Sequence, residues 1–306
     1  MQSISPKDDV IVTIGLCVKN SEATLKEAIE SILYQDYPTK KMELIVVEGH
    51  SRDKTHRILE ENLRDTKLKT RLFSENEGLG SARQTVVDNA SGEYIVWVDG
   101  DMVIAEDFVR RQVEFMKNHP CAGVAKGKYG TRQNNAHESI VATLENIEFL
   151  LATVSEGETN AKALGTSGCI YSVAALRQVN GFDTNIRGVG EDRDVENRMR
   201  NNGWKLYISS AVFFETRRQT WRSLWKEYYW HGSGGQYMFQ KNRPLLNLTK
   251  MLPPVAILAE FRRLPAAYKL THHKYVLFLP LHYVFKRIAW FLGFTNSLWK
   301  NKSSGK

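Results

Sequence analysis

The stretch Tyr94-Ile95-Val96-Trp97-Val98-Asp99-Gly100-Asp101 decides the fold of this chain. Its first five residues are apolar or aromatic, which predicts a buried strand over 94–98. Two carboxylates, two positions apart, follow that strand directly. In open α/β sheets, ligands bind outside the carboxyl ends of the strands. Asp99 and Asp101 are therefore expected at a ligand site.

The residues before this stretch alternate between two patterns. β-Branched and apolar runs predict strands over Val10–Val18, Leu44–Val47 and Thr70–Phe73. Amphipathic spacing predicts helices from Ser21 to about Leu33, from Asp53 to about Leu63 and from Leu79 to about Asn89. Alternation at this spacing predicts an α/β fold, with a mostly parallel sheet flanked by helices.

The second half of the chain is less regular. Ala136 to about Val154 and Glu191 to about Asn201 are expected to be helical, and Lys205–Ile208 is expected to be a strand. The small-residue segment Ala161–Val173 ends in a strand-like run. No internal repeat or low-complexity tract interrupts the pattern.

The two aspartates after the fourth strand have the chemistry of a divalent-cation site. Mg²⁺ and Mn²⁺ take oxygen ligands, often one or two carboxylates, while substrate phosphates complete the coordination. A solvated acidic turn is the alternative, but the position at the end of a buried strand favours the cation for Asp99 and Asp101.

Polar residues also follow the second and third strands. The segment Val47-Glu48-Gly49-His50-Ser51-Arg52-Asp53 places Glu48 where a carboxylate can accept hydrogen bonds from a base or ribose. Asp53 is interpreted as a helix cap. In Asn76–Arg83, glycines allow close approach of a ligand, and Arg83 can contact a phosphate. The alternative is a glycine-rich turn with a surface arginine.

A fourth segment reads Gly181-Phe182-Asp183 and then Gly190-Glu191-Asp192-Arg193-Asp194. An acidic helix N-terminus is its structural interpretation, since the helix dipole favours carboxylates there. That interpretation leaves Gly181–Asp183 unexplained. The four segments in this order resemble the family-two glycosyltransferases of GT-A fold, the nucleotide-diphospho-sugar transferase fold. The resemblance covers about residues 10–235 and implies a nucleotide-sugar donor and inversion at the anomeric carbon.

The resemblance also implies a role for each site residue. Asp192 matches the general base, Asp101 the principal metal ligand, and Asp99 a ligand of the metal, the nucleotide or both. Glu48 and the backbone around Val18 are expected to frame the base and ribose, and Arg83 to bind the nucleotide. The chemistry agrees, because a leaving nucleoside diphosphate needs a metal and cations, and an acceptor hydroxyl needs a base.

The acceptor side is less well marked. Gln219-Thr220-Trp221-Arg222 resembles the Q-x-x-R-W motif of cellulose-synthase-like members, but Ser223 stands where the tryptophan is expected. Trp230 and His231 follow and suit an aromatic platform for a sugar. An amphipathic helix with aromatic core contacts is an equal alternative. The candidate acceptor-side residues are Glu191, Gln219, Arg222, Trp230 and His231.

Charge divides the chain into two parts. The 306 residues carry 42 basic and 34 acidic side chains, but residues 245–306 hold 10 of the basic and one of the acidic ones. We therefore expect a catalytic domain over 1–222 and aromatic, basic helices over 223–306. Three cysteines without a C-x-x-C pair, and an N-terminal stretch without an apolar segment, indicate a reducing, cytosolic setting.

The basic tail predicts attachment to a membrane. Tyr275–Phe294 is long enough to span a bilayer, yet it contains Pro280, His282, Lys286 and Arg287, which are costly in lipid. A helical segment lying in the interface of an anionic membrane fits better. The alternatives are a true span and, for a soluble protein, a helical lid on the catalytic domain. Long aliphatic runs suit lipid better than a phosphodiester backbone, so no nucleic-acid partner is expected.

These features predict a metal-dependent inverting hexosyltransferase at the cytoplasmic face of the cell membrane. The expected acceptor is a lipid-linked saccharide or a growing glycan, and the leading donor is GDP-mannose, by resemblance to enzymes that build lipid-linked glycans. The alternatives are a polyprenyl-phosphate glycosyl synthase, a UDP-sugar-dependent polysaccharide synthase and, less favoured, a non-catalytic nucleotide-binding membrane adaptor. No G-x-G-x-x-G follows the first strand, which disfavours a dinucleotide oxidoreductase.

Overall fold

The computed structural model describes residues 12–130, 138–161, 163–186, 188–241 and 253–304. A nine-stranded sheet forms its centre, in the order β3-β2-β1-β4-β8-β6-β9-β5, with β7 paired to β9. The strands are β1 Val12–Val18, β2 Met42–Glu48, β3 Lys69–Ser74, β4 Tyr94–Asp99, β5 Met102–Ile104, β6 Ala122–Tyr129, β7 Gly157–Glu158, β8 Cys169–Ser172 and β9 Lys205–Glu215. The helices are α1 Leu25–Leu33, η1 Thr39–Lys41, α2 Thr55–Leu63, α3 Leu79–Asn89, α4 Phe108–Asn118, α5 Ile140–Ala152, α6 Val173–Gln178, α7 Glu191–Asn201, α8 Trp221–Lys241, α10 Pro253–Thr271, η3 Lys274–Phe278 and α11 Leu279–Ser304.

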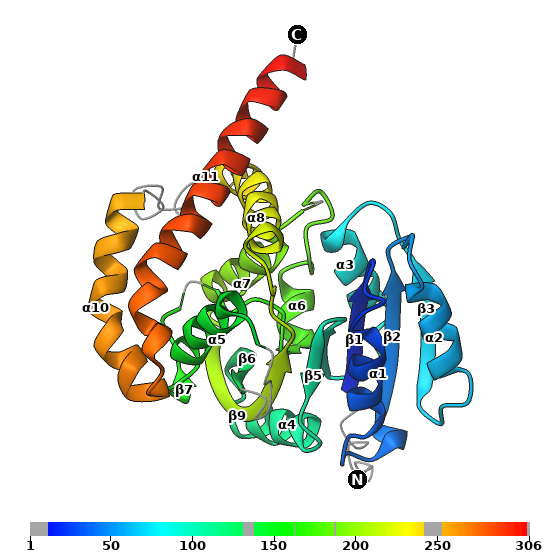
Figure 1. Cartoon of the computed structure of the whole chain (residues 1–306). Coiled ribbons are helices and arrows are strands. Elements are labelled where there is room, and N and C mark those ends of the chain that lie inside the picture. Colours follow the sequence, from blue (N-terminus) through cyan, green and yellow to red (C-terminus); the bar gives the residue numbers. More distant parts are fainter. Residues whose placement is uncertain (1–11, 131–137, 162, 187, 242–252, 305–306) are drawn as a thin grey trace, which may run out of the picture.

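Strands β3, β2, β1 and β4 form the parallel half of the sheet (Figure 1). Their register pairs Val18 with Glu48 and Cys17 with Asp99, so the carboxyl ends of the strands meet at one edge. Apolar side chains alternate between two cores, as a pleated strand buried on both faces requires. On β2, for example, Leu44 belongs to the core that includes residues of α1 and α4, and Ile45 belongs to the core on the other face, which includes residues of α3 and α7.

The other half of the sheet is mixed. β8 runs antiparallel to β4 and β6, β9 runs parallel to β6, and β5 runs antiparallel to β9. The sequence did not predict β5 and β6, and β9 extends to Glu215 rather than ending at Ile208. A three-residue strand and a strand interrupted by bulges leave no clear period of two, which explains both differences.

Most of the expected elements of the first half are confirmed. The helix expected from Ser21 begins at Leu25, although the Ser21 carbonyl already accepts from the Leu25 N–H at 3.0 Å. The Ser21 N–H donates to Thr55 Oγ1, at 2.7 Å. Asp53 caps as expected, since its Oδ1 accepts from the Thr55 N–H at 3.0 Å. The residues Val10 and Ala136, which were expected to begin a strand and a helix, lie outside the described residues.

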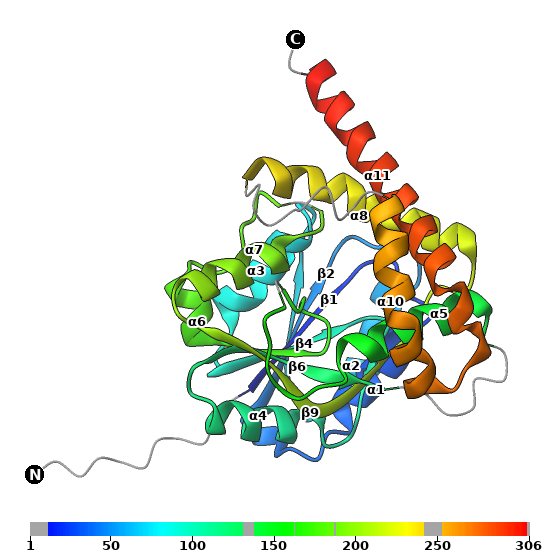
Figure 2. The same ribbon diagram turned by 90° about the vertical axis from the view of Figure 1, so that its left-hand side faces the viewer.

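Of the C-terminal helices, α10 and α11 pack against α5, and the end of α11 projects beyond the rest of the protein (Figure 2). Helices α8 and α11 pack backbone against backbone at two glycines. A Cβ on Gly232 would lie 1.9 Å from the Trp290 carbonyl oxygen, and one on Gly293 would lie 2.0 Å from that of Tyr229. Any side chain at either glycine would separate the helices. The boundary expected between residues 222 and 223 falls in the first turn of α8 and stays a prediction.

Candidate active site

A cleft of about 950 Å³ opens at the carboxyl edge of β1 and β4. One wall comes from the turns after these strands and from α3. The opposite wall comes from the 163–167 loop, the start of α7, and the inner sides of α8 and α11. Its volume suits a small-molecule site, and its place at the strand ends is the usual one in α/β sheets.

Three carboxylates gather beside the end of β4. Asp99 and Asp101 line the cleft, and the pairing of Met102 with Glu215 brings the end of β9 next to them. Burial, followed by the negative charges of Glu215 and Asp99, raises the pKa of Asp101 to about 7. The Arg218 Nη2 atom approaches Asp101 Oδ2 to 4.0 Å. An oxygen-only donor set with excess negative charge fits Mg²⁺ or Mn²⁺.

Arg83 connects this carboxylate group to α7. It is 6% exposed, and its guanidinium lies above the Trp97 ring with 6.0 Å to the centroid. Its Nη1 donates to Glu191 Oε1, and its Nη2 lies 3.8 Å from Asp99 Oδ1. Arg83 therefore lines the cleft as expected, while its charge is shared by two carboxylates. Such a buried bridge fixes the end of β4 relative to the start of α7.

Asp192 lies in the first turn of α7 and faces the cleft. Gly190 precedes the helix with a φ of +112°, a conformation that L side chains rarely adopt, so the sharp entry into α7 requires glycine. Asp192 is partly exposed, and its Oδ1 accepts from the Arg193 N–H at 2.6 Å. A Cβ on Gly165 would lie 3.3 Å from Asp192 Oδ2, so this glycine leaves space in front of the carboxylate.

Two residues expected at the nucleotide lie behind the cleft wall. The Glu48 carboxylate is 5% exposed and accepts the N–H groups of His50 and Ser51, at 3.0 and 2.7 Å. Burial would raise the pKa of Glu48, but these hydrogen bonds lower it. Val18 is 4% exposed, and its neighbours Cys17 and Lys19 line the cleft. In this conformation Glu48 orders the loop between β2 and α2.

The candidate acceptor-side residues divide into three groups. Gln219, Trp230 and His231 line the cleft, and Trp230 is 48% exposed. Burial lowers the pKa of His231. Glu191 pairs with Arg83, as described above. Arg222 is exposed and does not belong to the cleft lining.

Several cleft residues escaped the sequence analysis. Lys126 on β6 is 8% exposed, and its Nζ donates to the carbonyl oxygens of Leu164 and Ser167, at 2.9 and 2.6 Å. It thereby holds the loop that faces Asp192. Glu215 follows the same strand-end rule as Asp99. That rule did not reveal it, because β9 was expected to end at Ile208.

A second group of potential metal ligands lies away from Asp99. Glu145, Glu148 and His282 bring one ligand atom each to within 4.8 Å of one another. The Lys286 ammonium already contacts both carboxylates, with 2.6 Å from its Nζ to Glu145 Oε1. Burial would raise the pKa of Glu148, but Lys286 and His282 lower it to about 2. We assign this group to the ammonium rather than to a metal ion.

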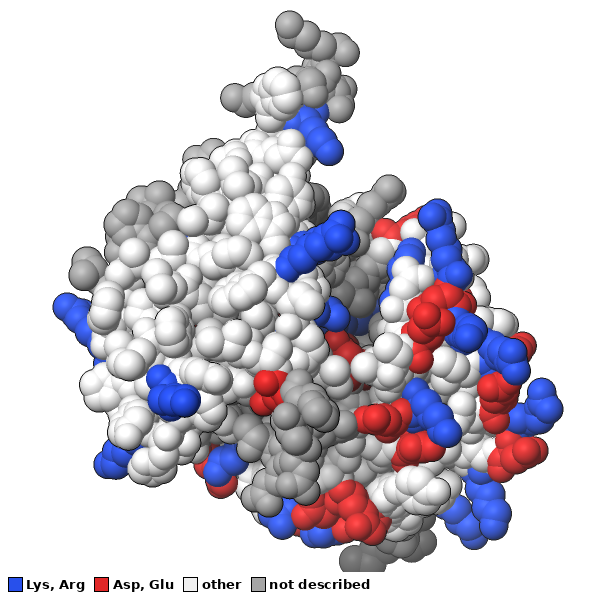
Figure 3. All heavy atoms as spheres, viewed as in Figure 1, with Lys and Arg blue, Asp and Glu red and all other residues white. Residues whose placement is uncertain are grey.

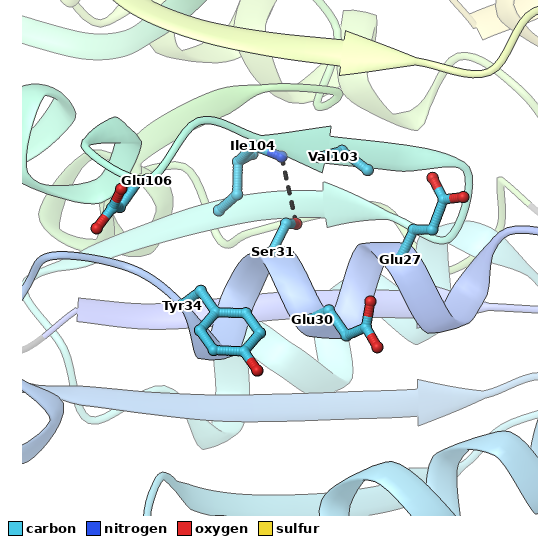
Figure 4. A pocket seen from close by; sticks show the side chains of 7 residues that line it. All are labelled: Glu27, Glu30, Ser31, Tyr34, Val103, Ile104 and Glu106. Carbon is cyan, nitrogen blue, oxygen red and sulfur yellow. Dashed lines mark hydrogen bonds between the residues drawn. The ribbon is translucent and has the colours of Figure 1, made fainter.

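A smaller hollow of about 380 Å³ lies between α1 and the β5 region (Figure 4). Its rim carries the acidic side chains of Glu27, Glu30 and Glu106. Ser31 Oγ accepts from the Ile104 N–H at 3.3 Å and joins the two walls. This hollow shares no lining residue with the cleft. The carboxylates and Arg83, which can act together on a substrate, line the cleft.

The fold and the cleft together define an α/β protein with a carboxylate site at the strand ends. Residues 13–180 match the family described as "Glycosyl transferase family 2". The chain belongs to this family, and the predicted family and GT-A fold are confirmed.

Curated relatives match most of the chain by sequence. A poly-beta-1,6-N-acetyl-D-glucosamine synthase of Staphylococcus epidermidis is 26% identical over 237 residues, which cover 73% of this chain and 54% of the relative. Its counterpart in Staphylococcus aureus strain COL is 23% identical over 270 residues, covering 84% of this chain and 64% of the relative. The chain thus spans about half to two thirds of the length of these relatives.

Solved structures share the fold. The mannosyltransferase PcManGT from Pyrobaculum calidifontis, in complex with GDP-Man and Mn²⁺, superposes with a TM-score of 0.65 at 17% identity, covering 97% of this chain and 90% of that one. TarS 1-349 of S. aureus, in complex with UDP-GlcNAc, gives a TM-score of 0.55 at 17% identity, covering 95% and 92%.

Proposed function

We propose that this protein transfers a hexosyl group from a nucleotide sugar to a saccharide acceptor, with inversion at the anomeric carbon. The observation that carries the proposal is the bridge through Arg83, which places the Asp99–Asp101 pair and Asp192 in one cleft. A carboxylate pair suited to a cation and a separate, partly exposed carboxylate are what this reaction needs.

Each side chain has a defined task in the reaction. Asp192 accepts the proton of the acceptor hydroxyl as its oxygen forms a bond to the anomeric carbon. The bond between that carbon and the diphosphate oxygen breaks, and the nucleoside diphosphate leaves. Asp99 and Asp101 would hold Mg²⁺ or Mn²⁺, which supplies charge neutralisation for the diphosphate. Arg83 keeps Asp99 and the start of α7 in fixed positions.

Two donors are favoured by different observations. The curated relatives are named for a polymer of N-acetylglucosamine, and the TarS structure contains UDP-GlcNAc, which supports a UDP-sugar-dependent polysaccharide synthase. GDP-mannose, the donor that the sequence analysis favoured, is supported by the complex of the mannosyltransferase. We propose testing UDP-GlcNAc first, because the relatives match by sequence as well as by fold.

The membrane proposal is supported by the outer surface of the C-terminal helices. Figure 3 shows few charged side chains on the face over α10 and α11, whereas acidic and basic groups are interspersed over α1 and α2. Leu277 and Leu281 are 71% and 67% exposed there. One segment, Lys274–Lys300, is long and apolar enough to cross a membrane, although 44% of its most apolar window is buried in the protein.

We propose that this face lies on the anionic, cytoplasmic surface of the cell membrane, without crossing it. Lys286 and Arg287 point to the cleft side, where Lys286 is 2% exposed, so neither needs to enter lipid. An exposed apolar face next to a basic segment is the usual composition of an interfacial helix. The basic excess of residues 245–306 adds attraction to anionic lipids.

A donor panel tests the activity. The full chain in anionic vesicles is incubated with UDP-GlcNAc, GDP-mannose and other nucleotide sugars, with Mg²⁺, Mn²⁺ or EDTA. Release of UDP or GDP and incorporation of the sugar into saccharide or lipid are measured. We expect turnover of one donor that EDTA abolishes. Nucleotide binding without turnover of any donor would indicate a non-catalytic adaptor instead, and transfer to dolichyl phosphate alone would indicate a polyprenyl-phosphate synthase.

A further inference from the structure

Figure 1 shows α11 on the far side of α8 from the parallel strands β1 to β3, and residues of α11 line the cleft. The cleft lining includes Tyr283, Lys286, Arg287 and Trp290 from this helix. These residues recur at i, i+3, i+4 and i+7, so they form one continuous stripe. The stripe lies outside residues 10–235, which the family resemblance covers, as does Met238 in the same lining.

The outer surface of the same helix has a different character. Leu281, Ile288 and Leu292 are 67%, 40% and 45% exposed. At about 100° per residue they lie roughly half a turn from the cleft-facing stripe. One helix therefore carries an apolar surface on the outside and aromatic and cationic groups on the inside.

The inner stripe has the chemistry of a carbohydrate subsite. The Arg287 guanidinium stacks on the Tyr283 ring, with 4.4 Å to the centroid, and its Nη2 donates to the Tyr283 hydroxyl. Tyr228 and Trp230 of α8 also line the cleft, and the Tyr228 ring lies next to the stripe, below the Lys286 ammonium. Rings pack against the C–H faces of sugars, and guanidinium and hydroxyl groups bond to sugar hydroxyls.

Lys286 fixes the position of this stripe. Its Nζ contacts Glu145 at 2.6 Å and also Glu148, both on α5, and it lies above the Tyr228 ring with 4.7 Å to the centroid. His282 adds contacts of 3.3 and 3.1 Å to the same two carboxylates. A buried ammonium between two carboxylates allows only one arrangement of α11 against α5, because any displacement leaves buried charge uncompensated.

We propose that the inner stripe of α11 is a wall of the acceptor subsite, where Tyr283 and Arg287 contact a neutral saccharide and Lys286 positions them. The inference rests on the proposed glycosyl transfer and names the acceptor side of that same cleft. Since the outer face of α11 is the proposed membrane surface, the acceptor is bound one helix diameter from the lipid. The acceptor is thus a saccharide held close to the membrane.

Kinetics on the full chain in anionic vesicles test this proposal. The donor is the one identified by the panel, and the acceptor probes are a β-1,6-linked N-acetylglucosamine tetrasaccharide and a mannose tetrasaccharide. Tyr283→Ala and Arg287→Ala are expected to raise the acceptor KM roughly tenfold, as the loss of one good contact does. Hydrolysis of the donor by water and the donor KM should stay within about twofold of wild type.

Lys286→Met tests the positioning role. It should raise the acceptor KM in the same way while the donor KM is kept, and Lys286→Arg should restore part of the acceptor affinity. Thr295→Ala, on the same helix, is the matched control and should leave all constants unchanged. If Lys286→Met does not fold, Tyr283→Ala decides the inference alone, because Tyr283 is partly exposed.

Three results would overturn the inference. One is an unchanged acceptor KM in Tyr283→Ala and Arg287→Ala. Another is an equal rise in donor and acceptor KM. The third is donor hydrolysis by the wild type without transfer to either tetrasaccharide. Absence of any donor turnover by the wild type would instead contradict the proposed function, so the two failures are distinguishable.

Discussion

The parallel half of the sheet and the C-terminal helices are stabilised in different ways. β1 to β4 are held by apolar side chains that alternate between two cores, such as Leu44 and Ile45. The C-terminal helices are held by close backbone packing at Gly232 and Gly293 and by a buried ammonium at Lys286. The first kind of packing tolerates substitution of one apolar residue for another. The second depends on single residues, so the C-terminal helices are the more easily disturbed of the two regions.

The largest effect is expected for a variant that loses the transfer reaction but keeps nucleotide binding in the cleft. Asp192→Asn removes the proposed base and should lower the transfer rate by roughly 10²–10⁴-fold. Nucleotide binding, measured by calorimetry, should be kept, because the residues proposed to bind the donor lie at the end of β4 and on α3 rather than on α7. Asp65→Asn, an exposed carboxylate after α2, is the control. Full transfer activity in Asp192→Asn would show that Asp192 is not the general base.

The next effect concerns the bridge between α3 and the start of α7. Arg83→Gln leaves the buried Glu191 carboxylate without its cation, which should lower the free energy of unfolding by about 3–5 kcal/mol. Chemical denaturation measures this change. Arg57→Gln breaks the exposed pair with Glu61 and should leave the free energy of unfolding almost unchanged, because solvent screens exposed pairs. Similar losses for the two variants would show that the bridge is no more important than a surface pair.

A smaller effect is expected at the contact of α8 with α11. Gly293→Ala places a methyl group against the Tyr229 carbonyl and should destabilise the protein by about 1–3 kcal/mol. The measurements are the thermal unfolding temperature, which should fall, and the acceptor KM, which should rise. Thr295→Ala keeps the packing and serves as the control. A stable Gly293→Ala variant with an unchanged acceptor KM would contradict the close packing of the helices.

The smallest effect is expected on membrane binding, and it compares the apolar face of the C-terminal helices with the exposed side of β3. Leu277→Glu places a charge on the apolar face and should reduce co-sedimentation with anionic phosphatidylglycerol vesicles by several-fold, because both apolar burial and charge attraction are lost. Leu72→Glu is the matched control on β3, where the leucine is 45% exposed. Equal vesicle binding by both variants and the wild type would place the membrane contact elsewhere.

The elements closest to the strand-end motifs were the most predictable. The helices Leu79–Asn89 and Glu191–Asn201 have the expected bounds, because local periodicity and glycine signals determine them. The placement of Glu48 was not predictable, because its carboxylate can accept hydrogen bonds equally well from a bound nucleotide or from the N–H groups of the loop. Only the geometry shows that His50 and Ser51 take both of its oxygens.

The sequence by itself determined the family, the βαβ order and the carboxylates at the ends of strands, because these depend on residues that are close together in the chain. The tertiary structure decided which distant groups meet. Arg83 and Glu191 are 108 positions apart, and Glu145 and Lys286 are 141 positions apart. Pairs at such separations leave no local pattern, because only the packed sheet and helices bring them within bonding distance. The bridge from Arg83 to Glu191 and the contact of Lys286 with α5 are therefore properties of the fold.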